Sequence, residues 1–292
     1  MLLAITVDTK LVALFGNPLG QSYSSRFHNS VYAELGLDCL YIPVELESGE
    51  HLGKVVDAVR LMNFAGFAIT KPFKEEIIPY LDEVDNFVKL MGSCNTVVAK
   101  SGKLVGYNTD GIGAITSLKI QGGISIEWKT YFIIGAGGTG KSVGFELAAH
   151  GAKRIYMVDT DERAKMCEEL VAHINSVYEG VCVAMRQDDI NKGVADSDVL
   201  LNLSGLGMTP YENETPLDKN AFEARHLCFD AIYNPQKTVF LQDAEKAGCK
   251  TVNGMGMLAY QAARQIQLWM GVDEPTEPTL RHLEQLVKET TN

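Results

Sequence analysis

The sequence is short of positive charge. Its 292 residues carry 26 Lys and Arg against 37 Asp and Glu, which gives a formal net charge of -11. A nucleic-acid or anionic-membrane partner requires a basic face, so this deficit argues against both kinds of partner. An anionic small molecule must therefore be held by local hydrogen-bond donors, against the overall field of the protein.

Cysteine is also scarce, and its spacing carries no pattern. The six cysteines are scattered without a C-x-x-C pair, at Cys39, Cys94, Cys167, Cys182, Cys228 and Cys249. Isolated thiols of this kind are typical of small buried residues in a reducing cytoplasm, not of disulfides or metal ligands. The histidines form no metal-binding pattern either, so we expect no metal site.

Long hydrophobic runs are missing as well. No apolar stretch approaches the roughly 18 residues of a membrane span, and the apolar start of the sequence is too short for a signal peptide. The hydrophobic fraction of 46% nevertheless indicates a globular protein with a substantial core, and the length allows two ordinary domains. We therefore predict a soluble, cytoplasmic protein.

The most informative stretch is a glycine-rich run between a predicted strand and a predicted helix. It consists of Gly135, Ala136, Gly137, Gly138, Thr139 and Gly140. Residues 130–134 before it are β-branched and aromatic, and residues 141–150 after it follow a helical pattern. In this context the glycines permit a tight turn and close approach to a pyrophosphate, and the helix N-terminus offers free N–H groups to it.

A second predicted strand, over 154–158, ends at Asp159. An acidic residue about 20 positions beyond the glycines is where the ribose-binding carboxylate of a dinucleotide site is expected. The alternative is an ordinary glycine turn in an α/β domain. We favour dinucleotide binding.

The opening third of the chain has its own α/β pattern. Predicted strands at 11–15, 39–46 and 64–70 alternate with predicted helices at 26–35 and 51–62, which indicates a βαβαβ unit with right-handed crossovers. A new helix is expected to start at Lys71–Pro72, and a hairpin is expected over 94–107.

We therefore predict an α/β fold of two domains with a cleft between them. The N-terminal βαβ domain covers 1–112, and a Rossmann-type domain covers 113–254. The helices within 255–292 are expected to pack back on the first domain.

Polar residues follow the predicted strands of the first domain, where ligand crevices of such folds lie. They are Ser22, Ser24, Thr70, Lys74, Asn95 and Asp110. Each also has a structural interpretation: the serines and Asp110 as helix caps, Asn95 as a turn former, and Lys74 as a surface lysine. Lys74 is our candidate for proton transfer, with Asp110 orienting it. His28 is interpreted as a structural residue of the first helix.

The chain resembles the shikimate dehydrogenase family, including its shikimate/quinate branch, over nearly its whole length. The matching stretches are Gly16-Asn17-Pro18 with Ser22-Tyr23-Ser24, Thr70-Lys71-Pro72-Phe73-Lys74, Asn95-Thr96, Asn108-Thr109-Asp110-Gly111, Gly135-Ala136-Gly137-Gly138, and Asn253-Gly254-Met255-Gly256-Met257 with Gln261. Six motifs in the family's order are far more specific than any one of them.

The resemblance implies roles for these residues. Ser22 and Ser24, helped by Tyr233, would hold the substrate carboxylate. Ring hydroxyls would be bound by Thr70, Asn95, Asp110 and Gln261. Lys74, paired with Asp110, would give a proton to the carbonyl oxygen as hydride arrives from the nicotinamide. The cofactor site would include the glycine-rich run with Asp159, Arg163, Ala231 and Gly254.

Three positions bear on the choice of substrate and cofactor. Ala68 stands where the family usually has an asparagine of the substrate site, so one hydrogen bond to the ligand is missing. Asp159 favours NAD because a carboxylate accepts ribose hydroxyls and repels a 2′-phosphate, whereas Arg163 is the residue that would permit NADP.

The sequence thus predicts an NAD(P)-dependent dehydrogenase of shikimate, with a place in aromatic amino acid biosynthesis and a homodimer as a possible assembly. A quinate-type or other catabolic dehydrogenase is the nearest alternative, and an amino-acid or folate-type dehydrogenase a more distant one. A dinucleotide- and shikimate-binding sensor without turnover is the alternative from a different class.

Overall fold

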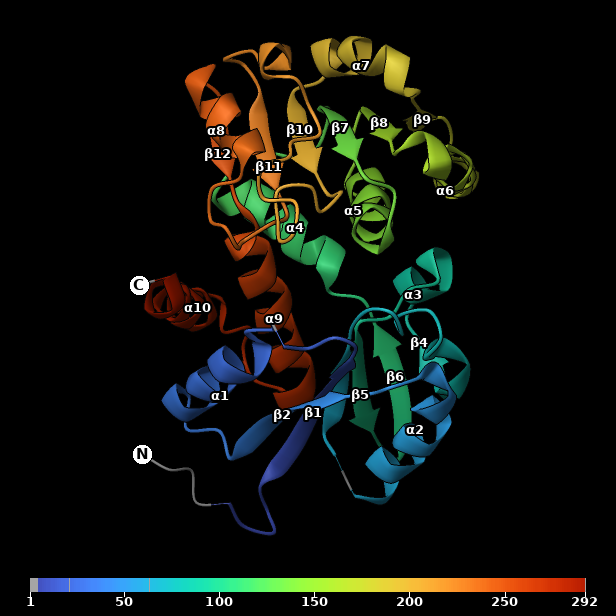
Figure 1. The fold of residues 1–292 in the computed structure, drawn as a ribbon. Helices are drawn as coiled ribbons and strands as arrows, with labels where there is room; N and C mark the ends of the chain where they lie inside the picture. Colours follow the sequence, from blue (N-terminus) through green and yellow to red (C-terminus); the bar gives the residue numbers. More distant parts are fainter. Residues whose placement is uncertain (1–4, 21, 63, 292) are drawn as a thin grey trace. The chain divides into compact units, whose positions relative to one another are not determined.

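The computed structural model describes residues 5–20, 22–62 and 64–291 (Figure 1). The chain forms two compact units. Unit 1 contains Met1–Thr109 and Gln261–Asn292, and unit 2 contains Asp110–Tyr260.

Unit 1 is built on a six-stranded sheet with the strand order β2-β1-β3-β5-β6-β4. The strands are β1 (Lys10–Gly16), β2 (Cys39–Glu45), β3 (Gly66–Ile69), β4 (Glu83–Val84), β5 (Thr96–Lys100) and β6 (Lys103–Tyr107). The first three strands are parallel, as predicted for a βαβαβ unit, and β5 and β6 form the predicted antiparallel hairpin.

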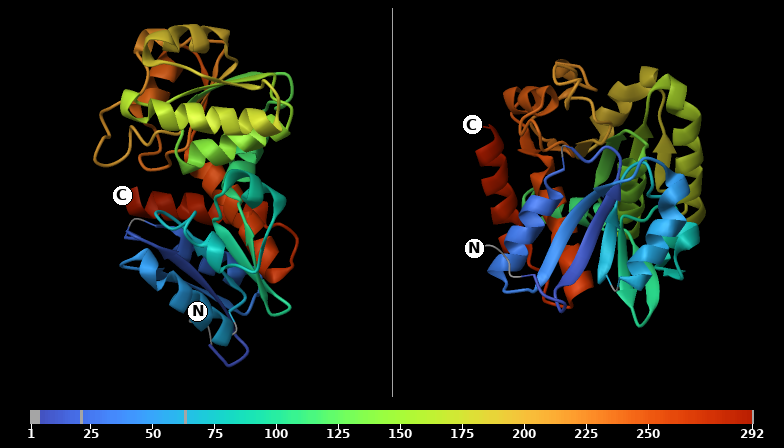
Figure 2. Two further views of the ribbon diagram at one scale, coloured as in Figure 1. Left: turned by 90° about the vertical axis from the view of Figure 1, so that its right-hand side faces the viewer. Right: turned by 60° about the horizontal axis from the view of Figure 1, so that its bottom comes forward.

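Helices cover both faces of this sheet (Figure 2). They are α1 (Ser24–Glu34), α2 (Leu52–Leu61), α3 (Asn86–Met91), α10 (Thr276–Thr291) and the C-terminal part of α9 (Gly254–Met270), with short 3-10 turns η1 (Gly49–His51) and η2 (Ile78–Tyr80). Successive residues of β1 point to opposite faces, so the strand joins two apolar clusters: one with Val56 of α2, the other with Val31 of α1 and Trp269 of α9.

Unit 2 has a six-stranded parallel sheet with the order β12-β11-β10-β7-β8-β9. The strands are β7 (Thr130–Ile134), β8 (Arg154–Val158), β9 (Cys182–Ala184), β10 (Val199–Asn202), β11 (Leu227–Asp230) and β12 (Lys250–Val252). The chain moves outward in one direction from β7 to β9, then returns to the other side of β7 with β10. This reversal is the topological switch point of a Rossmann-type fold, as predicted.

The other elements of unit 2 are mostly connecting helices. They are α4 (Asp110–Ile120), α5 (Gly138–Ala149), α6 (Ala164–Val177), α7 (Ile190–Asp196) and α8 (Val239–Lys246), with the 3-10 turns η3 (Asp161–Arg163), η4 (Gln187–Asp189) and η5 (Lys219–Ala221). α5 follows the glycine-rich turn as predicted, but begins three residues earlier than expected, within the glycines themselves.

The prediction of a helix that begins at Lys71–Pro72 is wrong. Residues 71–77 form a series of turns, followed by the short η2. The carbonyl oxygens of Lys71 and Lys74 accept the N–H groups of Asn17 and Cys94, at 3.1 and 2.8 Å, so they are used by other segments instead of by a helix. The sequence analysis also did not predict α3, β4 or α7.

All six cysteines are buried and unpaired, as predicted. Within the described part of the chain, no helix has the length and apolar character needed to span a bilayer.

The core of unit 1 makes a direct stability test possible. Phe67 is fully buried and packs edge-on against Phe15, with ring centroids 5.2 Å apart. We expect Phe67→Ala to lower the free energy of unfolding by about 3–5 kcal/mol, because a large buried ring leaves a cavity. Urea denaturation followed by circular dichroism measures this loss. Leu61→Ala, at a position that is 87% exposed, is the control and should change it by less than about 0.5 kcal/mol.

Candidate active site

In unit 1 the loops that follow β1 and β3 are held against each other. Thr70 donates its N–H to the carbonyl of Phe15 at 2.9 Å, and Asn17 donates its N–H to the carbonyl of Lys71 at 3.1 Å. Gly16 lies where they meet: a Cβ at this residue would come within 2.3 Å of the Thr70 methyl carbon. The segment that leads to Ser22 and the segment that carries Lys74 therefore form one structure.

The same backbone bonding brings Lys74 and Asn95 together. The carbonyl of Lys74 accepts the N–H of Cys94, the residue directly before Asn95, and the carbonyl of Asn95 accepts the N–H of Ile69 at 2.9 Å. Lys74 itself is half-buried. Thr70, Lys74 and Asn95, which come from two different connections, are thus fixed relative to one another.

Asn95 is 3% exposed and its amide is held from several sides. Its Oδ1 accepts the N–H of Thr109 at 2.9 Å and the hydroxyl of Thr96 at 2.7 Å, while its Nδ2 donates to Thr109 Oγ1 at 3.1 Å. Thr109 Oγ1 in turn donates to Gln261 Oε1 at 3.2 Å. The network therefore fixes which way the Asn95 amide points.

Three members of this network were not predicted as site residues: Thr96, Thr109 and Gln265. Gln265 Nε2 donates to Thr96 Oγ1 at 2.9 Å, one turn of α9 beyond Gln261. Thr96 and Thr109 each follow an asparagine in one of the motifs quoted above. This repeated Asn-Thr pair was the signal in the sequence that could have identified them.

Ser22 and Ser24 lie at the N-terminus of α1. Tyr23 occupies the N-cap position, so neither serine is the N-cap residue, although Ser22 meets the N–H of the first helical residue as a capping side chain would. Ser22 Oγ accepts the N–H of Ser24 at 3.3 Å, and both residues are half-buried. The start of α1 therefore presents two hydroxyl-bearing residues from one compact turn.

His28 holds that turn from within α1. It is fully buried and stacks on Tyr41, with ring centroids 4.3 Å apart, and its Nδ1 lies 2.7 Å from the carbonyl oxygen of Ser24. A carbonyl is an acceptor only, so Nδ1 carries the proton. Burial lowers the pKa of His28 to about 4. His28 is thus a neutral structural residue, in agreement with the prediction.

Ala68 is 4% exposed and belongs to the apolar cluster that contains Val98, Ile266 and Trp269. It pairs with Thr96 across β3 and β5. Its methyl group contributes packing, with no polar group of its own for a ligand.

In unit 2 the glycine-rich turn connects β7 to α5 through close backbone contacts. Gly135 has a φ of +104°, and a Cβ there would lie 2.7 Å from the backbone N of Ser204. A Cβ at Gly140 would lie 2.0 Å from the carbonyl oxygen of Gly135. At Gly138, by contrast, a Cβ would meet no atom of the described residues within 4 Å, so the first turn of α5 has space for a ligand beside its N–H groups.

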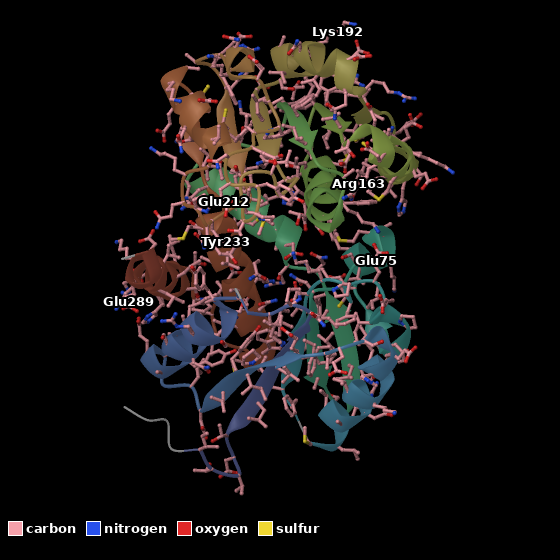
Figure 3. All side chains as sticks on the ribbon, in the orientation of Figure 1. Glu75, Arg163, Lys192, Glu212, Tyr233 and Glu289 are labelled. Carbon is pink, nitrogen blue, oxygen red and sulfur yellow. The ribbon has the colours of Figure 1, made fainter. Side chains whose placement is uncertain are left out.

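Asp159 and Arg163 form a pair beside this turn. Arg163 is labelled in Figure 3. Asp159 Oδ2 accepts the N–H of Ala136 at 2.8 Å and lies 3.4 Å from Arg163 Nε, and its Oδ1 accepts the N–H of Thr160 at 2.8 Å. The Asp159 side chain is 8% exposed, whereas that of Arg163 is 49% exposed. The carboxylate therefore anchors the glycine turn, and the guanidinium is the more accessible group.

The segment after β11 carries Ala231 and Tyr233. Ala231 donates its N–H to the carbonyl of Asn202 at 3.0 Å, and the carbonyl of Ile232 accepts the N–H of Gly254 at 2.9 Å. A Cβ at Gly254 would lie 2.0 Å from the Ala231 carbonyl oxygen, so only glycine fits there.

The predicted site residues are thus divided between the two units. Unit 1 contains Ser22, Ser24, Thr70, Lys74, Asn95 and Gln261. Unit 2 contains Asp110, which is the first residue of α4, together with Tyr233 and all the predicted cofactor residues.

The fold and these clusters define a class. A parallel sheet whose order reverses beside a glycine-rich turn is a Rossmann-type dinucleotide-binding unit, and here it is joined to an α/β unit with a buried polar cluster. This plan is typical of dehydrogenases that use a nicotinamide cofactor.

Comparisons with known proteins narrow the class. Residues 14–97 match the shikimate dehydrogenase substrate binding domain, and residues 254–284 match the shikimate 5′-dehydrogenase C-terminal domain. The chain is 41% identical over 276 residues to the shikimate dehydrogenase (NADP(+)) of Alkaliphilus oremlandii, covering 94% of this chain and 96% of that relative. The chain belongs to the shikimate dehydrogenase family.

Two solved structures are similar over almost the whole chain. Shikimate 5-dehydrogenase from Listeria monocytogenes, in complex with shikimate and NAD, has a TM-score of 0.89 at 33% identity and covers 97% of this chain and 98% of that one. Quinate dehydrogenase from Corynebacterium glutamicum, in complex with NAD, has a TM-score of 0.88 at 27% identity, with 96% and 99% covered.

The burial of His28 has a measurable consequence. Because its folded pKa is about 4, below the ordinary 6.5, the unfolded chain binds a proton first as the pH falls. Neutral His28 therefore makes its full contribution to the free energy of unfolding above pH 6.5. That contribution is lost as the pH falls toward 4, by about 3 kcal/mol in total. His28→Phe, which keeps the aromatic stack, should remove that part of the pH dependence in urea denaturation. The same substitution at exposed His51 is the control, and an unchanged slope in His28→Phe would contradict this assignment.

Proposed function

We propose that Lys74 and Asp110 move the proton while a hydride passes between the ring acid and the nicotinamide. The chain is an NAD(P)-dependent oxidoreductase that interconverts shikimate and its 3-dehydro form. The observation that supports the assignment of Lys74 is the backbone bond from Cys94, which holds the backbone of Lys74 next to the segment that carries the rigidly oriented amide of Asn95.

In the direction of oxidation, the neutral Lys74 amine takes the proton of the substrate hydroxyl as the neighbouring C–H bond gives up its hydride. In the direction of reduction, the Lys74 ammonium returns that proton to the carbonyl oxygen. By the family resemblance, Asp110 would orient Lys74 and balance its charge. The bound nicotinamide supplies or accepts the hydride, and the protein supplies position and charge.

The substrate is assigned to the polar residues named in the sequence analysis, most of which belong to unit 1. Ser22 and Ser24 donate their hydroxyl groups to the carboxylate, which suits two hydroxyls presented by one turn, and Tyr233 adds a third donor. The ring hydroxyls are bound by Thr70, Asn95, Asp110 and Gln261. Polar side chains already held by hydrogen bonds lose little entropy on binding, so this cluster is suited to a polyhydroxylated ring.

The dinucleotide is assigned to unit 2, with its pyrophosphate at the first turn of α5 and its nicotinamide near Ala231 and Gly254. The open space at Gly138 and the close packing at Gly135 fit such a ligand.

NAD is the proposed preference, because Asp159 places a carboxylate where a 2′-phosphate would approach. NADP is the second candidate, since Arg163 pairs with Asp159 and is the more exposed of the two. Quinate is the second candidate for the substrate, in view of the similar quinate dehydrogenase structure. A cytoplasmic location suits the six buried, unpaired thiols, and a homodimer is our proposed assembly.

The role of Lys74 is tested by Lys74→Met, which keeps the aliphatic stem. We expect kcat to fall by about 10²–10⁴-fold, because the proton then lacks a donor and acceptor. The measurement is cofactor reduction at saturating shikimate, then at saturating quinate. The exposed neighbour provides the control, since Lys71→Met should retain wild-type kcat. A Lys74→Met enzyme with near-wild-type kcat would refute the role, and a wild type that binds shikimate and dinucleotide without turnover would support the sensor alternative.

Cofactor preference is tested by Arg163→Leu. We expect wild type to have the higher kcat/KM with NAD. In Arg163→Leu the value for NADP should fall about tenfold or more, because the 2′-phosphate loses a charge-assisted hydrogen bond, while the value for NAD changes little. Arg154→Leu is the matched control, since Arg154 begins β8 and lies at the opposite end of that strand from Asp159. Equal losses with both cofactors in Arg163→Leu would show that Arg163 does not recognise the 2′-phosphate.

A further inference from the structure

Asp230 is a buried carboxylate at the end of β11 that the proposed reaction does not use. It is fully buried and accepts three hydrogen bonds: from the N–H of Ile232 at 2.9 Å, from the hydroxyl of Thr238 at 2.6 Å and from Asn202 Nδ2 at 3.1 Å. Every one of these partners faces it as a donor.

The orientation of two of these donors is fixed by other bonds. Asn202 Oδ1 accepts the hydroxyl of Ser204 at 2.6 Å, so the Nδ2 group is the one that faces Asp230. Thr238 Oγ1 lies 3.4 Å from the N–H of Leu241 as an acceptor, which leaves its own proton for Asp230. An ionised Asp230 satisfies all three donors, whereas the added proton of a neutral Asp230 would find no acceptor among these groups.

This negative charge has no cation beside it within the described part of the chain. Lys237, nearby in sequence, is exposed and pairs with Glu245 at 2.6 Å. The titratable residues Asp198 and His226 lie just before β10 and β11, at the opposite ends of those strands. Burial raises the pKa of Asp230 to about 6, which leaves it mostly ionised at neutral pH. A buried charge without a counter-charge costs free energy, so a positively charged ligand that binds nearby would stabilise it.

Its position in the sheet indicates which ligand. The carboxyl ends of β8, β7, β10 and β11 follow one another along one edge, and Asp159, Gly135, Asn202 and Asp230 stand at or just after those ends. A dinucleotide bound at the switch point extends to both sides of β7. If its adenosine half lies on the side of Asp159, its nicotinamide half lies on the side of Asp230. Two strand spacings place Asp230 about 10 Å along the edge from β7.

We propose that the Asp230 carboxylate makes unit 2 bind the oxidised dinucleotide in preference to the reduced one. The nicotinamide ring carries a positive charge when oxidised and none when reduced, so a fixed negative charge on its side of the sheet attracts only the oxidised form. This inference rests on the proposed function, because it requires the nicotinamide to lie near Ala231. At a separation on the order of 10 Å between the carboxylate and the ring, a partly screened charge changes the ratio of the two dissociation constants roughly tenfold.

The test compares wild type with Asp230→Asn. Dissociation constants of the oxidised and reduced forms of NAD and of NADP are measured by titration calorimetry. In Asp230→Asn the affinity for the oxidised form should fall roughly tenfold more than the affinity for the reduced form. Thr238→Val, measured at pH 9, is the matched control: the lost hydrogen bond raises the pKa of Asp230, but at this pH the carboxylate stays ionised, so both affinities should change by the same factor.

Two results would overturn the inference, and a third measurement replaces the variant if it does not fold. If Asp230→Asn changes both affinities equally, Asp230 only shapes the 231–238 segment and the inference is wrong. If wild type binds neither form, the proposed cofactor role itself fails, and the inference with it. If Asp230→Asn does not fold, the same ratio is measured in wild type from pH 7.5 to pH 5: a several-fold loss of preference for the oxidised form supports the charge effect, and a constant ratio overturns it.

Discussion

The arrangement of unit 1 depends on two carbonyl groups, those of Lys71 and Lys74. Each is taken by an N–H from another connection, one from Asn17 after β1 and one from Cys94 before β5. These bonds accompany a series of turns in place of a helix after β3, and they hold three loops together at the carboxyl ends of the parallel strands β1 and β3. A lysine on a free helix N-terminus would have many orientations, whereas the backbone of Lys74 has one.

In its proposed role, unit 2 must bind an anion in a protein with a formal net charge of -11. In the proposed cofactor site, the pyrophosphate would be met by N–H groups at the start of α5, which are local donors without a net charge. Arg163 compensates Asp159 on one side of the glycine turn, while Asp230 on the other side lies among uncharged donors. The sheet edge is therefore charge-compensated on the Asp159 side and negative on the Asp230 side. This difference matches the proposed ligand, whose nicotinamide end carries a positive charge when oxidised.

Local patterns were sufficient for most elements and for the glycine turn, because a β-branched strand followed by glycines and an apolar helix allows few folds. They failed where the local structure depends on bonds to segments distant in the sequence. The turns at 71–77 result from bonds to residues more than 15 positions away, which no helical propensity reveals. Asp159 was placed correctly, but its bond to the N–H of Ala136 depends on how β7 and β8 align. Asp230 resembles any aspartate at a strand end until Asn202 comes to lie beside it.

The two tryptophans differ sharply in their surroundings. Trp269 is 5% exposed in unit 1, with its indole N–H donated to the carbonyl of Val97 at 2.9 Å, whereas Trp128 is 81% exposed in unit 2. The emission of Trp128 is therefore already that of an indole in water, and opening of unit 2 can change it little. A red shift of the intrinsic fluorescence reports on unit 1. The chain thus contains its own optical label for the unit that carries Lys74, without any engineered probe.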